Sequence, residues 1–121
     1  MPQPGSDTHP TISTHVLDTG SGRPAAGVPV ALFKLAEDGR PIRMTQALTD
    51  ADGRVGDLLE RPLTTGVYRL EFRPRGPADG EGDPAAFFER VAVDFRVDDA
   101  TRSYHVPLLL APFSVTTYRG S

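Results

Sequence analysis

The sequence predicts an all-β fold, namely a β-sandwich of seven to eight short antiparallel strands with at most one short helix. Apolar-rich runs alternate along the chain with turns rich in Gly, Pro and Asp, which is the usual all-β pattern. Within several runs, apolar and polar residues also alternate one by one, as expected of a strand with one buried face. With 121 residues, the chain has the size of one domain.

The expected strands follow one another at short intervals. The first occupies residues 12–18 and leads into a Gly/Pro/Ser-rich turn region, residues 19–27. Further strand-like runs occupy residues 28–36, 42–49, 66–73, 90–97, 103–110 and 114–119, and Asp/Gly turns are expected at 37–41 and 50–54. Residues 1–10 contain three prolines and are expected to form a mobile lead, which leaves residues 11–121 as the domain.

The clearest alternation is in residues 66–73, where Tyr68, Leu70 and Phe72 share one face and charged residues share the other. Residues 90–97 repeat this pattern with valines and a phenylalanine on the apolar face. By contrast, residues 74–85 are dense in Pro, Gly and acids and should form a loop. Any helix there would be brief and would start near Asp83.

Composition excludes several classes of function. The net charge is −3 and no basic run occurs, which argues against nucleic acid as a partner. The absence of cysteine excludes disulfides, thiolate metal sites and a Cys nucleophile. No apolar run approaches the ~20 residues that span a bilayer, so no membrane association is expected. The first ten residues do not resemble a secretory signal, and the cytoplasm is the expected location.

Two histidines are the candidates for chemistry. Strand alternation places His105 on the outer face, opposite Tyr104 and Val106, and it places His15 on the face opposite Val16. A single strand histidine is more often an ordinary surface residue. Neither the spacing of zinc ligands nor a GxSxG nucleophile turn is present, and the Gly-rich pieces lack the strand–helix context of a phosphate loop. From the residues alone, the chain is a soluble β-sandwich with two unexplained histidines.

Four stretches resemble the signatures of the transthyretin-like 5-hydroxyisourate hydrolases. Residues 103–121 (SYHVPLLLAPFSVTTYRGS) are similar to the C-terminal signature, in which a His-Val-Pro-Leu-Leu strand leads to a terminal Tyr-Arg-Gly-Ser. Residues 12–35 resemble the N-terminal signature, with His-Val-Leu-Asp before a Gly-Arg-Pro-Ala turn. Residues 49–54 (TDADGR) and 86–91 (AFFERV) are similar to the connecting motifs. The matches occur in the family order at both ends of the chain.

The resemblance implies a transthyretin-like β-sandwich that hydrolyses 5-hydroxyisourate to 2-oxo-4-hydroxy-4-carboxy-5-ureidoimidazoline in urate catabolism, without a cofactor or a metal. The residues that match the family's catalytic residues are His15, Arg54, His105 and Ser121. Substrate binding is implied for the same four together with Tyr118, Arg119 and Gly120. The two histidines share the base and acid roles, and the sequence does not order them.

The family also implies a homotetramer, built as a dimer of dimers. Two other readings remain: a transthyretin-like carrier of a small ligand without catalysis, and a plain interaction module. The terminal tetrapeptide distinguishes the hydrolases from the carrier. This chain departs from relatives in three places: Ser103 stands where many have histidine, Arg90 where many have proline, and residues 76–85 where many have a short helix.

Overall fold

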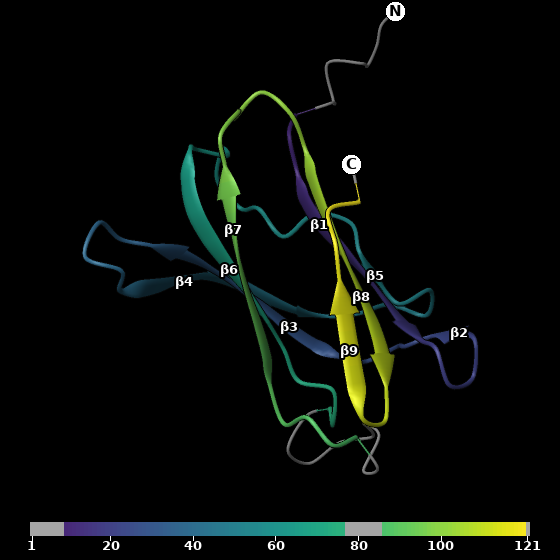
Figure 1. Ribbon diagram of the computed structural model, residues 1–121. Coiled ribbons are helices and arrows are strands. Elements are labelled where there is room, and N and C mark those ends of the chain that lie inside the picture. Colours follow the sequence, from purple (N-terminus) through teal and green to yellow (C-terminus); the bar gives the residue numbers. More distant parts are fainter. Residues whose placement is uncertain (1–8, 77–85, 121) are drawn as a thin grey trace, which may run out of the picture.

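Nine β-strands form two sheets in the computed structural model, which describes residues 9–76 and 86–120 (Figure 1). The strands are β1 (Ile12–Asp18), β2 (Arg23–Pro24), β3 (Pro29–Leu35), β4 (Pro41–Leu48), β5 (Arg54–Val55), β6 (Gly66–Phe72), β7 (Val91–Val97), β8 (Tyr104–Ala111) and β9 (Ser114–Thr117). The predicted all-β class is confirmed. The count exceeds seven to eight because β2 and β5 are two-residue strands, too short to produce a visible alternation.

One sheet has the strand order β2-β1-β8-β9, with β5 also paired to β1, and the other has the order β4-β3-β6-β7. The prediction of wholly antiparallel pairing is wrong for one pair, because β1 and β8 run parallel, in register from Ile12–Tyr104 to Asp18–Leu110. Side-chain alternation has the same period in both orientations, so the sequence pattern did not distinguish them. This parallel pair places the first strand of the chain beside the last strand but one.

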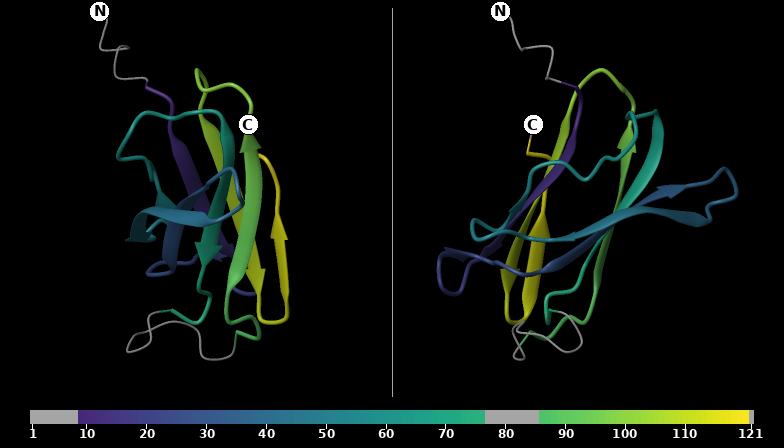
Figure 2. Two further views of the ribbon diagram at one scale, coloured as in Figure 1. Left: turned by 90° about the vertical axis from the view of Figure 1, so that its left-hand side faces the viewer. Right: turned by 180° about the vertical axis from the view of Figure 1, so that it is seen from behind.

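The two sheets bury their facing side chains against each other, and the β3–β4 hairpin extends past the rest of the molecule (Figure 2). The expected alternation is confirmed: Tyr68, Leu70 and Phe72 are buried, and so are Tyr104 and Val106. A fully buried leucine contributes roughly 1.5–3 kcal/mol through the hydrophobic effect. Thr14, buried among these side chains, donates its hydroxyl to the carbonyl of Val106 at 2.6 Å.

Two expectations fall at least partly on residues that the structure does not describe. Of the lead predicted at residues 1–10, only His9 and Pro10 belong to the described part. The loop of residues 74–85 lies mainly outside it, as does the start of any helix near Asp83. Residues 9–76 and 86–120 contain no helix, and therefore none that could cross a membrane.

Candidate active site

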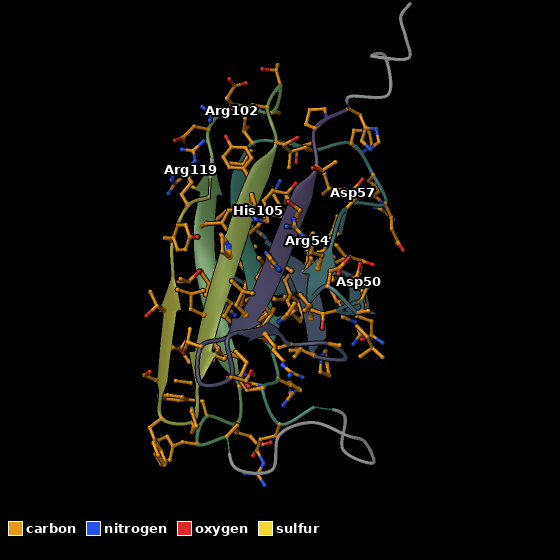
Figure 3. All side chains as sticks on the ribbon, turned by 90° about the vertical axis from the view of Figure 1, so that its right-hand side faces the viewer. Asp50, Arg54, Asp57, Arg102, His105 and Arg119 are labelled. Carbon is orange, nitrogen blue, oxygen red and sulfur yellow. The ribbon has the colours of Figure 1, made fainter. Side chains whose placement is uncertain are left out.

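The pairing of β1 with β5 and with β8 places three predicted site residues on the outer face of this sheet. His15 on β1 is the register partner of Arg54 on β5, and Ser13 on β1 is the partner of His105 on β8. Register partners project from the same face of a sheet. Because Thr14 and Val106 face the core, these side chains face outward. Figure 3 shows Arg54 and His105 on this face.

Arg54 is positioned by the Asp/Gly turn that precedes it. The Asp50 carboxylate accepts the backbone N–H groups of Asp52 at 2.8 Å and Arg54 at 3.0 Å. The bond from the Arg54 backbone is the main cause that lowers the pKa of Asp50, with smaller contributions from the charges of Arg54 and His15. The turn predicted at residues 50–54 is thus a side-chain-capped turn beside β1.

Gly53 fixes this turn against β1. Its φ of 76° is in the left-handed region, and a Cβ there would lie 2.4 Å from the carbonyl oxygen of Val16. Its own carbonyl accepts the N–H of Val16 at 2.7 Å. Only glycine fits this close approach. The turn thereby holds the next residue, Arg54, beside His15 on β1.

The His105 ring is held through one of its two nitrogens. Its Nδ1 lies 2.8 Å from the hydroxyl oxygen of Ser13. Burial is the main cause that lowers the pKa of His105 below 6.5, and the positive charges of Arg54 and His15 lower it further. All three causes favour the neutral imidazole at pH 7, which is the form required of a general base.

The C-terminal tail folds back over β8. The N–H of Gly120 donates to the carbonyl of His105 at 2.8 Å, and the hydroxyl of Thr117 donates to the carbonyl of Pro107 at 2.8 Å. A Cβ built on Gly120 would lie 2.6 Å from Cδ2 of His105. Gly120 of the predicted terminal motif therefore packs directly on the predicted catalytic ring.

Arg119 is held near the same strand. Its guanidinium carbon lies 5.0 Å from the ring centre of Tyr104, a distance suited to a cation–π contact. Tyr104 is itself held by Asp99, whose N–H donates to the phenol oxygen at 3.0 Å and whose carbonyl accepts the phenol proton at 3.1 Å. Tyr118, by contrast, is 54% exposed.

A cavity of about 170 Å³ lies beneath the tail. Its lining residues are Val93, Phe95, Arg96, Tyr104, His105, Val106, Thr117, Tyr118 and Arg119. It thus joins His105 to the tail, but neither His15 nor Arg54 lines it. A hollow of about 410 Å³ is on the other sheet, around Phe33, Arg43 and Arg73, away from the histidines. In this single chain the face that carries His15 and Arg54 is open.

The structure therefore brings His15, Arg54 and His105 to one face, packs Gly120 on the His105 ring and places Arg119 over the ring of Tyr104. Ser121 lies outside the described residues, so its predicted role is untested. Within residues 9–76 and 86–120 there is no group of three or more His, Asp or Glu that could hold a metal ion.

The sequence reasoning missed the contact between Ser13 and His105. Alternation placed Ser13 on the face of His15, but only the parallel register of β1 and β8 sets it opposite His105. Ser103, one of the three expected departures from the family pattern, is exposed and accepts the N–H of Thr11 at 2.9 Å. Its hydroxyl thus holds the beginning of β1 against β8.

Comparisons with known proteins agree with this geometry. The model of the HIUase/Transthyretin family matches residues 12–120. A 5-hydroxyisourate hydrolase of Deinococcus radiodurans is 44% identical over 118 residues, covering 93% of this chain and 98% of that protein. A 5-hydroxyisourate hydrolase of Halalkalibacterium halodurans is 41% identical over 117 residues, covering 91% and 97%.

Solved structures of both branches of the family are similar to this chain. The 5-hydroxyisourate hydrolase of Klebsiella pneumoniae has a TM-score of 0.73 and 34% identity, and covers 93% of this chain and 99% of its own. Transthyretin from Sparus aurata has a TM-score of 0.76 and 30% identity, and covers 90% and 95%. The resemblance first seen in the terminal motifs is thereby confirmed, and the chain belongs to the HIUase/Transthyretin family.

Proposed function

We propose that this protein hydrolyses 5-hydroxyisourate to 2-oxo-4-hydroxy-4-carboxy-5-ureidoimidazoline in urate degradation. The observation that carries the proposal is the packing of the tail on His105, on the face that also bears His15 and Arg54. The relatives from Deinococcus radiodurans and Halalkalibacterium halodurans, which share more than 40% of their residues with this chain, support it.

In the proposed reaction, a histidine removes a proton from water while the water oxygen attacks the acyl carbon of the six-membered ring. The C–N bond then breaks, and the leaving nitrogen receives a proton from the imidazolium or from the second histidine. His105 and His15 share these roles. The lowered pKa of His105 supports a base that is free of its proton at neutral pH.

Positive charge is the second requirement of this chemistry. The attacked carbonyl becomes an oxyanion, which a fixed guanidinium stabilises more strongly in a dry site than in water. Arg54 has the favourable position, because its backbone is held by Asp50 and by the pairing with His15. Tyr118, Arg119, Gly120 and Ser121 are proposed to contact the substrate, and Ser121 to donate or accept a hydrogen bond to substrate or water.

A carrier of a small ligand without catalysis is the second candidate. It is favoured by the TM-score of 0.76 to transthyretin from Sparus aurata, slightly above the 0.73 to the Klebsiella pneumoniae hydrolase. Both values describe the same sandwich, so the fold does not separate the two functions. The two histidines and the tetrapeptide favour the hydrolase.

We further propose a homotetramer, assembled as a dimer of dimers, in the cytoplasm. The open face around His15 and Arg54 supports assembly, because a second subunit can exclude water from it. Strands β7 and β9 are at the edges of the two sheets, where pairing between subunits can extend a sheet. Light scattering over a dilution series, with parallel assays, tests this. A monomer with the full rate would contradict the need for assembly.

The function is tested by the absorbance decay of freshly generated 5-hydroxyisourate with and without the protein. The wild type should accelerate the decay, and His105→Asn should lower kcat by ~10²–10⁴-fold. Because His105 is on the outer face, its loss should change the free energy of unfolding by only about 1 kcal/mol. A folded wild type that leaves the decay rate unchanged would exclude the hydrolase, and ligand binding without turnover would then support the carrier.

A further inference from the structure

The contact between Ser13 and His105 is built by the fold rather than by a chance approach of two flexible side chains. Both residues belong to the interior of paired strands, and they are register partners in the parallel β1–β8 ladder. Their side-chain atoms, Ser13 Oγ and His105 Nδ1, are 2.8 Å apart and partly buried. The register sets the two residues directly opposite each other on one face of the sheet, and this brings the two atoms into contact.

The other side of the His105 ring is also fixed. Gly120 packs so closely on Cδ2 that a Cβ there would approach it to 2.6 Å. With Nδ1 occupied by Ser13 and Cδ2 covered by Gly120, Nε2 is the ring nitrogen left for a water or a substrate.

We propose that Ser13 is a positioning residue: its hydroxyl accepts the Nδ1–H of His105 and thereby selects the tautomer whose Nε2 is unprotonated and faces the substrate. The catalytic part of this inference rests on the proposed hydrolase function. When Nε2 takes a proton from water, Nδ1 already donates to the serine oxygen, so the ring needs neither rotation nor a new partner.

A serine suits this position better than a carboxylate because it is uncharged. A carboxylate partner would stabilise the imidazolium and raise the pKa of His105, opposing the effect of Arg54 and His15. The hydroxyl orients the ring without adding charge. Ser13 thus supplies the orienting contact of a catalytic triad while leaving a weakly basic imidazole in place.

Three variants test the proposal: Ser13→Ala, Ser13→Thr and, as a matched control, Ser114→Ala. Ser114 belongs to the same sheet, but it pairs with Ala111 at the far end of β8 from His105. Ser13→Ala should lower kcat by ~10–100-fold, the usual effect of removing an orienting partner, with little change in KM. Ser13→Thr, which restores the hydroxyl, should recover kcat to within a few-fold, and Ser114→Ala should match the wild type.

The tautomer itself is measured by ¹⁵N NMR of the histidine side chains, at a pH where His105 is neutral. The wild type and Ser13→Thr should show protonated Nδ1, and Ser13→Ala should lose that preference. Protonated Nε2 in the wild type, or an unchanged tautomer and kcat in Ser13→Ala, would overturn the proposal. Because the NMR reading needs no substrate, it still decides the positioning role if the wild type proves not to hydrolyse 5-hydroxyisourate.

Discussion

The outward faces of the two sheets differ in whether their charged side chains form ion pairs. On the β4-β3-β6-β7 sheet, two charged side chains of β6, Arg69 and Glu71, each have a partner of opposite sign. The guanidinium of Arg69 on β6 binds both carboxylate oxygens of Asp94 on β7, at 2.7 and 3.2 Å. Arg90, just before β7, lies 3.5 Å from Glu71 on β6. This face resembles an ordinary solvent-exposed sheet surface.

On the β1–β8 sheet, basic side chains gather instead. His15, Arg54 and His105 form no ion pair with any carboxylate in residues 9–76 and 86–120. Asp50 is near, but its carboxylate is occupied by backbone N–H groups of the turn. Besides burial, the basic groups gathered on this face oppose protonation of His105. The contrast between the two faces supports the proposal that this one binds an electron-rich ligand.

The largest loss of activity is expected when the tail is removed from the basic face, that is, the outward face that carries His15, Arg54 and His105. Deleting residues 118–121 removes the Gly120–His105 hydrogen bond and the contact of Arg119 with Tyr104. We expect hydrolysis to fall by roughly 10²-fold or more, as when charge-stabilising groups are lost from a site. Circular dichroism and melting should show a folded sandwich, because the deleted residues follow the last strand. A folded truncation with full activity would contradict the role of the tail.

A single methyl group should reproduce part of that loss. In Gly120→Ala the new Cβ would lie 2.6 Å from Cδ2 of His105 and 3.1 Å from Cγ of Pro107, so the ring or the tail must shift. A shift of about 1 Å can cost up to ~10²-fold in rate. Gly56→Ala is the matched control, since a Cβ at Gly56 meets nothing within 4 Å. Equal kcat values for the two variants would show that the close packing on His105 is unimportant.

Most of the fold was predictable from the sequence, because alternation at positions such as Tyr68, Leu70 and Phe72 reports directly which face is buried. The parallel direction of β1 and β8 was not, since alternation carries no information on strand direction. The same limit hid the partnership of Ser13 with His105, which depends on that pairing and its register. His105 itself was placed on the outer face correctly, but alternation alone did not bring it near Arg54.

A smaller effect is expected in the pH dependence of hydrolysis, which should reflect the lowered pKa of His105. Burial, Arg54 and His15 lower the pKa of His105, so the neutral base persists below pH 6.5 and the rate should decline only under more acidic conditions. The unfolded chain binds this proton more readily, so folding stability also falls as pH drops from 6.5 through the lowered pKa. In an NMR titration, Arg54→Gln should raise the pKa of His105. An acid limb of kcat/KM above pH 6.5 would contradict this account.

The smallest effect is expected on the other sheet, where Asp94→Asn removes one charge of the Arg69–Asp94 pair. The pair is partly exposed, with side-chain exposures of 28% for Arg69 and 44% for Asp94, so the free energy of unfolding should fall by about 1 kcal/mol or less. The hydrogen bond from Arg69 lowers the pKa of Asp94, so this contribution is present at neutral pH and is lost as pH falls through the lowered value. Wild type and Asp94→Asn should therefore differ least in acid, when urea unfolding is compared at several pH values.

Turnover of 5-hydroxyisourate should be unchanged in Asp94→Asn, because Asp94 projects from the outward face of the other sheet, away from His105. A several-fold loss of kcat in a fully folded Asp94→Asn protein would show that the two faces are coupled, and the division between a paired surface and a ligand-binding surface would fail.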